Sequence, residues 1–203
     1  MVSIIYYTSN HEEPKFEKKI QDNILKVTSL PIISISQKSM DFGHNICVGE
    51  TVASYLNEWN QILIGLKEAK TEFCIAAESD CLYPPEYFTF IPPRNDVVYK
   101  YDNVWVYFKN TFRFWKKNGF CEGAQICGRE YWIERLESTI KALNGKWGKL
   151  ALSLFPTQKT YTGNPIITFK TGRGVNNKTG IISLSKVSVL PYWGTGKEIQ
   201  NIL

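Results

Sequence analysis

The sequence predicts an α/β fold with a mostly parallel central sheet in its first half and a mixed second half. Over residues 2–77, apolar runs typical of buried strands alternate with amphipathic segments typical of helices. Because each helix connects two strands, the strands are expected to run parallel with right-handed crossovers. After the pair Pro84 and Pro85, short aromatic-rich segments replace this alternation. The first half therefore has the order of a Rossmann-like, nucleotide-binding unit.

Two strands and one helix are expected before residue 37. Residues 2–7 and 32–36 are short apolar runs, which favour buried strands. Between them, Pro14 is suited to the first turn of a helix. The apolar side chains of this helix fall on one stripe, which consists of Phe16, Ile20, Ile24 and Leu25. Residues 37–49 are polar and contain glycine, so a loop is expected there.

A longer helix is expected over residues 51–69, followed by a third strand over residues 72–77. The helix is indicated by apolar residues at spacings of three and four, which are Val52, Tyr55, Leu56, Trp59, Ile62, Leu63 and Leu66. The strand shows little polar alternation, as expected of a strand covered on both faces. Ligands of such sheets bind beyond the carboxyl ends of the strands. The candidate site is therefore expected at residues 8–11, 37 onward and 78–83.

The second half is expected to complete the same domain rather than to form a separate unit. Its expected elements are strands over residues 96–101, 103–108, 112–115 and 166–169 and a helix over residues 129–143. We expect a single domain over residues 1–203, with a first half over 1–95 and a second half with a C-terminal loop region over 96–203.

Composition and charge narrow the class of protein. The formal charge of +5, from 24 Lys and Arg against 19 Asp and Glu, suits phosphate-bearing partners without indicating nucleic acid. No apolar run reaches the length of a membrane span, and the first residues lack the basic segment of a signal peptide, so we expect a soluble, cytoplasmic protein. The five cysteines are then expected to be reduced. With no CxxC pair and two histidines, any metal is expected to be a hard ion on oxygen ligands.

The segment Glu78-Ser79-Asp80 directly follows the third expected strand. Two carboxylates at this spacing can share a divalent ion, one of them directly and the other through water. Mg²⁺ or Mn²⁺ suits this arrangement, because it retains several waters and takes further oxygens from a diphosphate. Such an ion neutralises the charge that develops on a departing nucleoside diphosphate. The alternative is a solvated strand end in which Asp80 caps a turn.

Three segments resemble the small A-type (GT-A fold) glycosyltransferases of bacteria and phages. They are SIIYYTSN at residues 3–10, QILIGL at 61–66 and AESDCLYP at 77–84. In that family a D-x-D-like acidic motif after a strand binds the metal of a nucleotide sugar. The resemblance covers residues 1 to about 110 well and the rest weakly. It implies a GT-A type α/β fold, a nucleoside-diphosphate sugar as donor, and a divalent ion.

The resemblance also implies roles for individual residues. Asp80 would be the main metal ligand, and Glu78 its partner or a contact to the donor ribose. Thr8 and Asn10 would lie at the nucleotide base and ribose, and Gln61 would face the donor from the long helix. The alternative for Gln61 is a surface helix residue. This sequence departs from the commonest pattern in having Glu at the first acidic position, and Ser79 where the closest relatives have histidine.

Two further roles have candidates in the second half. Many A-type transferases take a third metal ligand, often histidine, from this part, but this chain has no histidine after His44. The candidate replacement is the Gly-rich loop over residues 170–178, where backbone N–H groups could approach phosphate and Arg173 or Lys178 could supply a cation. Its alternative is an ordinary hairpin. Asp102 and Glu122 are candidates for the base of an inverting reaction; a retaining reaction needs none.

The acceptor is the least determined part of this hypothesis. Residues 112–117 interleave aromatic and basic side chains, which suit stacking on bases and sugars or, alternatively, a sheet with one face in the core. The acceptor could thus be a hydroxymethylated pyrimidine in phage DNA, extruded to meet the donor, or a glycan. A phage-encoded enzyme would act in the host cytoplasm. The alternatives are a nucleotidyltransferase and a non-catalytic module that binds sugar or nucleic acid.

Overall fold

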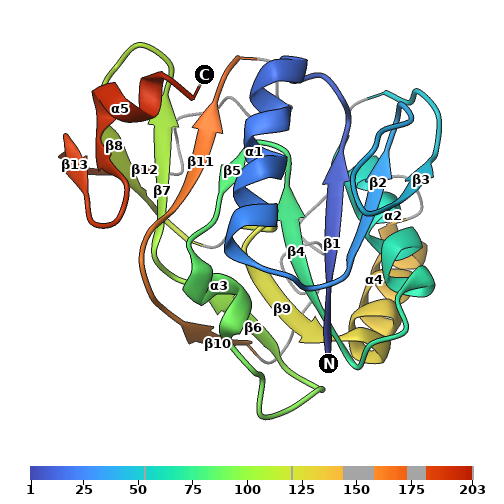
Figure 1. The fold of residues 1–203 in the computed structure, drawn as a ribbon. Helices are drawn as coiled ribbons and strands as arrows, with labels where there is room; N and C mark the ends of the chain where they lie inside the picture. The colour runs from blue at the N-terminus through green and yellow to red at the C-terminus, as the bar shows by residue number, and fades with distance from the viewer. Residues whose placement is uncertain (53, 120, 144–157, 173–181, 203) are drawn as a thin grey trace.

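The computed structural model describes residues 1–52, 54–119, 121–143, 158–172 and 182–202, which form two main β-sheets and the helices that cover them (Figure 1). The larger sheet has seven strands, in the spatial order β10 (Gln158–Tyr161), β6 (Val98–Tyr101), β9 (Gln125–Gly128), β4 (Phe73–Glu78), β1 (Val2–Thr8), β2 (Ile32–Ser36) and β3 (His44–Cys47). Strand β1 pairs in parallel with β2 and β4, and β2 pairs in parallel with β3. Strand β9 runs antiparallel to both β4 and β6.

The register of these strands brings their carboxyl ends to one edge of the sheet. Thr8 at the end of β1 lies opposite Ser36 at the end of β2, and Tyr7 lies opposite Glu78 at the end of β4. Residues that follow these strands are therefore close in space although they are far apart in the sequence. This edge points upward in Figure 1.

The smaller sheet has five strands, in the order β12 (Ile182–Val187), β8 (Phe114–Lys117), β7 (Val104–Phe108), β11 (Ile166–Lys170) and β5 (Cys81–Leu82). Strand β5 begins three residues after the end of β4 and pairs antiparallel with β11. The backbone N–H of Phe169 also donates to the carbonyl oxygen of Asp80 at 2.8 Å. The turn at residues 78–81 thus connects the two sheets. A short hairpin, β13 (Val189–Leu190) and β14 (Gly194–Thr195), lies beside the last helix.

The two faces of the larger sheet are covered by different helices (Figure 1). Helix α1 (Pro14–Val27) packs on one face, in a core shared with Ile4 and Tyr6 of β1. Helices α2 (Tyr55–Glu68) and α4 (Arg129–Leu143) cover the other, in a core shared with Ile5 and Tyr7. Alternate residues of β1 thus enter opposite cores, as the period of a strand requires. Helices α3 (Pro85–Thr89) and α5 (Gly196–Gln200) are short.

Most of the expected elements of the first half are present, with differences at their ends. The strand over Ile32–Ser36 and the helix over Arg129–Leu143 have the expected bounds. The second helix begins at Tyr55 rather than near residue 51, because Ser54 caps it by accepting a hydrogen bond from Asn57 N at 3.2 Å. The expectation of a loop over residues 37–49 was wrong, because β3 pairs with β2 there. Among the described residues, no helix is long and apolar enough to cross a membrane.

Gly65 allows α2 to pack closely on the parallel strands. A Cβ atom at this position would lie 2.4 Å from Ile35 Cδ1 and 2.7 Å from Ile5 Cγ2. Both distances are shorter than van der Waals contact, so any larger residue would displace the helix or the two isoleucines.

We expect Gly65→Ala to lower the free energy of unfolding by about 1–3 kcal/mol, the usual cost of overpacking a core. The neighbouring Ile64 is partly exposed on the same helix, so Ile64→Ala is the control and should change stability by about 0.5 kcal/mol or less. Urea denaturation followed by circular dichroism measures both. Equal stability of Gly65→Ala and wild type would contradict the close packing.

Candidate functional site

Acidic and thiol side chains converge beyond the carboxyl end of β4. We define the acidic cluster as Glu58, Glu78, Asp80, Cys81, Cys121 and Glu122. Glu78 ends β4, Asp80 lies in the following turn and Cys81 begins β5. Cys121 and Glu122 come from the segment between β8 and β9, and Glu58 from the first turn of α2. The potential ligand atoms of Glu78, Cys81 and Cys121 all lie within 4.8 Å of one another.

Glu78 is held in place by two tyrosines and a glycine. The Tyr7 hydroxyl donates to Glu78 Oε1 at 2.8 Å, from the neighbouring strand. The Glu78 backbone N–H donates to the Tyr83 hydroxyl at 2.8 Å, and that hydroxyl donates to the Gly123 carbonyl oxygen at 2.8 Å. A Cβ atom at Gly123 would lie 2.6 Å from Glu78 Cδ. A side chain at position 123 would therefore push the carboxyl group out of its place.

Burial and nearby like charges make the carboxyl groups of Glu78 and Glu58 hard to ionise. Burial raises the pKa of Glu78 well above its ordinary value, and the nearby Cys121 and Asp80 raise it further. Burial also raises the pKa of Glu58 to about 8, with Glu122 as the next largest cause. The cluster therefore carries more potential negative charge than it can hold in the absence of a cation.

Lys170, the last residue of β11, supplies one positive charge at this place. Its Nζ lies 3.9 Å from Asp80 Oδ2. Burial lowers the pKa of Lys170, but the carboxyl groups of Asp80 and Glu78 outweigh burial and raise it above its ordinary value. Lys170 therefore remains positively charged next to the acidic turn.

The two cysteines of the cluster interact with each other and with the acids. The Cys81 thiol lies 3.3 Å from Asp80 Oδ1, to which it can donate. Where Cys81 donates its one thiol proton to Cys121 instead, this hydrogen bond lowers the pKa of the Cys121 thiol to about 6, although burial raises it. All five cysteines of the chain are free thiols, as expected from the sequence. Cys121 is thus in contact with a second thiol among the acidic side chains.

Gln61 and Thr8 lie under the carboxyl edge and stabilise it. The Gln61 side chain is buried, and its Nε2 donates to the carbonyl oxygens of Thr8 at 2.8 Å and Ile35 at 3.2 Å. The alternative of a surface glutamine was therefore wrong. Thr8 Oγ1 accepts a hydrogen bond from the backbone N–H of Asn10 at 2.9 Å. Both side chains hold the ends of β1 and β2 at a fixed spacing.

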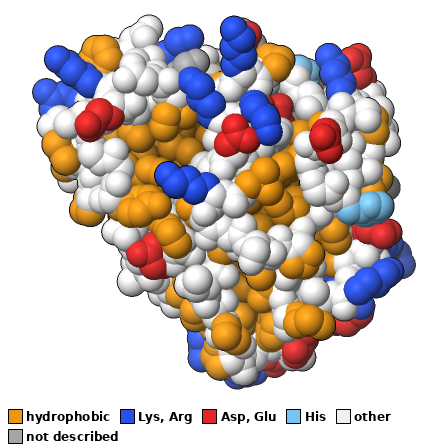
Figure 2. All heavy atoms as spheres, in the orientation of Figure 1, with side chains coloured by type: hydrophobic (Ala, Val, Ile, Leu, Met, Phe, Trp, Pro, Cys, Tyr) orange, Lys and Arg blue, Asp and Glu red, His pale blue; other side chains and the backbone are white. Residues whose placement is uncertain are grey.

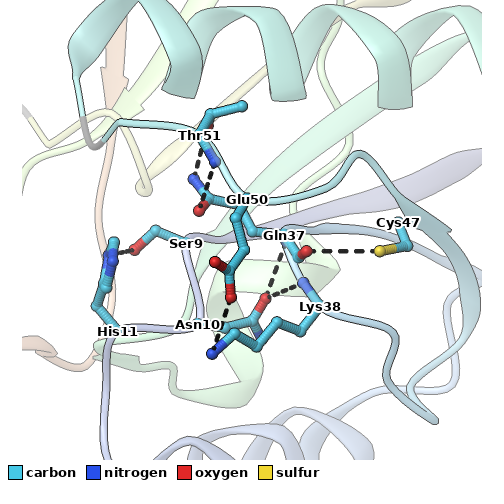
Figure 3. A network of polar contacts seen from close by, with 8 residues as sticks. All are labelled: Ser9, Asn10, His11, Gln37, Lys38, Cys47, Glu50 and Thr51. Carbon is cyan, nitrogen blue, oxygen red and sulfur yellow. Dashed lines mark hydrogen bonds and ion pairs between the residues drawn. The ribbon is translucent and has the colours of Figure 1, made fainter.

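Asn10 connects the segments that follow β1 and β2 (Figure 3). Its φ of 53° lies in the left-handed region, which asparagine adopts more readily than most residues. Its Oδ1 accepts from the backbone N–H groups of Gln37 at 2.9 Å and Lys38 at 2.8 Å. The Gln37 side chain in turn pairs with Thr51, donating to its Oγ1 at 2.9 Å and accepting from its N–H at 3.2 Å. This network fixes the rim beside the cluster, on the side where the nucleotide was expected.

The remaining candidates differ in their distance from the cluster. Glu122 is the nearby charge that contributes most to the raised pKa of Glu58, and its Oε2 accepts from Gln125 Nε2 at 3.3 Å. Asp102 follows β6 and is exposed, and its backbone oxygen accepts from Lys116 Nζ at 2.9 Å. The structure thus brings Glu122, and not Asp102, to the described acids. Arg173 and Lys178 lie outside the described residues.

Glu58 and Cys121 lay outside the segments expected to form the site, whereas Cys81 lies in the expected region 78–83 and Lys170 begins the expected loop 170–178. In the sequence, Glu58 falls on the polar face of the expected helix. It reaches the edge of the sheet only because it lies in the first turn of α2. Cys81 directly follows the acidic motif Glu78-Ser79-Asp80, and this position is its signal in the sequence. Cys121 comes from a distant segment, and no local pattern marks it.

A hollow of about 760 Å³ lies at the opposite, amino edge of the larger sheet. It is lined by residues before β4 and β6 and by the first turn of α4, with charges of both signs including Lys70, Glu72 and Arg129. Because the length of β4 separates it from Glu78, this hollow is not part of the candidate site.

No protein-family model and no curated protein matches the sequence. Solved structures, in contrast, share its fold. TarS from S. aureus, in a crystal structure with UDP-GlcNAc, is 12% identical with a TM-score of 0.52, over 83% of this chain and 58% of that one. A glycosyltransferase involved in the glycosylation of the major capsid of PBCV-1 is 11% identical with a TM-score of 0.50, over 79% of this chain and 81% of that one. This chain therefore spans less than two thirds of the TarS structure. The likeness confirms the predicted GT-A type α/β fold with its mostly parallel sheet.

We expect the raised pKa of Glu58 to make stability depend on pH. Between the ordinary value near pH 4.3 and about 8, the folded state keeps a proton that the unfolded state releases, so the free energy of unfolding falls as pH rises. Glu58→Gln removes this loss, and its stability relative to wild type should rise by about 2–4 kcal/mol between pH 5 and 8.

Urea denaturation at several pH values, with a chelator present, measures this difference. Glu50→Gln is the matched control, because Glu50 is an exposed carboxylate paired with Lys38 and should give a constant difference from wild type. A constant difference for Glu58→Gln as well would show that Glu58 ionises normally.

Proposed function

We propose that this protein is a metal-dependent glycosyltransferase that moves a sugar from a nucleoside-diphosphate sugar to an acceptor hydroxyl group. The observation that carries the proposal is the position of Glu78 and Asp80, beyond the carboxyl end of a central strand in a mostly parallel sheet. Ligands of open α/β sheets bind at this edge. The fold is shared with TarS, whose structure contains UDP-GlcNAc, and with the PBCV-1 glycosyltransferase.

The residues present fit a divalent ion. Glu78 and Asp80 would hold it. The pKa values of Glu78 and Glu58 are raised first by burial and then by neighbouring acidic groups, and a cation would relieve the repulsion among those groups. When bound, Mg²⁺ or Mn²⁺ would supply charge neutralisation for the departing diphosphate. Lys170 lies on the Asp80 side of the cluster and offers a second positive charge to the same phosphates. Arg173 and Lys178 are proposed to add to it.

Other residues would orient the donor and accept a proton. Thr8, Asn10 and Gln61 shape the rim where the nucleotide base and ribose are proposed to lie. Glu122 is the preferred base for an inverting reaction, because it lies among the acids that surround the proposed leaving group. Asp102 remains the second candidate. A base at either position would take the proton of the acceptor hydroxyl as it attacks the anomeric carbon.

The acceptor is proposed to be a glycan or a hydroxymethylated pyrimidine in DNA, met in the cytoplasm. Figure 2 shows Lys and Arg side chains along the upper edge of the molecule, toward which β1 points, and this supports a phosphate-bearing acceptor. Part of the aromatic and basic segment is used by the fold itself, since Phe114 is buried and Lys116 Nζ lies 5.7 Å from the Trp105 ring centre. Phe112 and Tyr192 are exposed and available for stacking on a base or a sugar.

We expect one class of nucleoside-diphosphate sugar to raise the Tm of the wild-type protein only when Mn²⁺ is present. A ligand that binds the folded state at about 100 times its Kd should raise Tm by about 5 °C or more. Asp80→Asn should abolish this metal-dependent shift. The measurement is a thermal-shift screen of UDP-, GDP- and CDP-sugars with and without Mn²⁺.

Asp41→Asn is the control, because it removes an exposed carboxylate away from the cluster and should keep the full shift. No shift with any donor, or the same shift in Asp80→Asn, would contradict the metal-dependent donor site and favour a binding module without catalysis.

We expect Glu122→Gln to lower kcat by about 100-fold or more with little change in donor affinity, because a general base acts in the transition state. Asp102→Asn should lower kcat by less than about tenfold. Initial rates with saturating donor measure both. A larger effect of Asp102→Asn would assign the base to Asp102, and two small effects would favour a retaining reaction.

A further inference from the structure

We propose that Glu78, Cys81 and Cys121 form a second cation site, which shares Glu78 with the proposed Mg²⁺ or Mn²⁺ site and binds a thiophilic divalent cation of the zinc class. The site overlaps the proposed donor site but does not depend on the proposed reaction. It departs from the expectation of oxygen ligands alone, which rested on the spacing of cysteines in the sequence.

The positions of the ligand atoms carry this proposal. One atom from each of Glu78, Cys81 and Cys121 lies within 4.8 Å of the others. Zn²⁺ binds sulfur at about 2.3 Å and carboxylate oxygen at about 2.0–2.2 Å, so two ligands of one tetrahedral ion lie about 3.3–3.8 Å apart. The three groups therefore need shifts of about 1 Å or less to reach a common ion.

The chemistry of the ligands favours a particular class of ion. Two thiolates and one carboxylate form a mixed sulfur and oxygen set, which selects Zn²⁺, Cd²⁺ or Co²⁺ over the hard ions Mg²⁺ and Mn²⁺. Cys81 is fully buried and Cys121 is 6% exposed, so both sulfur atoms are shielded from bulk water. Glu78 is only half-buried, and Asp80 Oδ1 lies 3.3 Å from the Cys81 sulfur.

The surroundings supply the charge and space that such a site needs. The carboxyl groups of Glu58, Asp80 and Glu122 surround these three ligands, and Lys170 and Lys117 are nearby cations. Binding of the ion releases to solvent the protons that the thiols of Cys81 and Cys121 and the Glu78 carboxyl group carry. Gly123 leaves room for the Glu78 carboxyl group beside the sulfurs.

The test is a titration of the reduced, metal-free full-length protein with Co²⁺, followed by absorption. All variants carry Cys47→Ser, since Cys47 is exposed and could bind metal by itself. We expect a sulfur-to-cobalt charge-transfer band that saturates at one ion per chain and disappears when Zn²⁺ is added. A tenfold excess of Mg²⁺ over Zn²⁺ should not displace the bound Zn²⁺, so the cobalt band should not return.

In this background Cys121→Ser and Cys81→Ser should each lower Co²⁺ affinity by at least about tenfold and reduce the band. Glu78→Gln should lower affinity while the band remains, because it retains both sulfurs. Cys127→Ala is the control, since Cys127 is buried in the other core beside Cys74 and should leave the titration unchanged. Circular dichroism establishes that each variant is folded. If a cysteine variant is unfolded, the Co²⁺ affinity of Glu78→Gln tests the site instead.

Absence of a charge-transfer band in wild type, or a band that both cysteine variants retain, would overturn the proposal. These results are independent of the donor screen. A cobalt band without any donor shift would uphold this metal site and contradict the glycosyltransferase. A Mn²⁺-dependent donor shift without a cobalt band would support the glycosyltransferase and contradict the site formed by Glu78, Cys81 and Cys121.

Discussion

The structure of this edge depends on keeping one carboxyl group, Glu78, at the end of a central strand and partly away from water. Such burial is costly unless every polar atom has a partner, and neighbouring elements supply them. Tyr7 binds its side chain from β1, Tyr83 binds its backbone, and Gly123 leaves the space that it occupies. The neighbouring strand β1 and the chain between β4 and β9 thus supply the partners and the space for this one side chain.

The same placement explains why the acidic cluster is suited to cations. Glu58, Glu78 and Asp80 meet from two elements, and Glu122 and Cys121 approach from a third. One lysine, Lys170, is closely paired with these groups in the described part of the chain. Repulsion of this kind is tolerated at sites whose ligand removes it, and it lowers the stability of the free protein in exchange for affinity.

The sequence predicted the first half of the fold better than the second, for physical reasons. Strands covered on both faces and helices with a regular stripe have strong patterns. Short strands such as β9 (Gln125–Gly128) in the second half, and β3 (His44–Cys47), which was missed in the first, depend on pairing with neighbouring strands. For the site, the motif at Glu78 and Asp80 was found because both acids are local. Cys121 and Lys170 come close to these acids only through the tertiary fold. Gln61 was named as a candidate from the sequence, but its hydrogen bonds to the ends of β1 and β2 were not expected.

The two-residue strand β5 (Cys81–Leu82) has a consequence for how the protein folds during synthesis. It pairs with β11 (Ile166–Lys170), from the last quarter of the chain, and the carbonyl oxygen of Asp80 is bound by Phe169. Contacts between segments so far apart form late, because a long loop must close first. The parallel strands β1, β2 and β4 can associate on the ribosome well before the turn that holds the acids has its partner. The nascent chain therefore acquires its scaffold first, and the acidic turn reaches its final geometry only after residue 170 has left the exit tunnel.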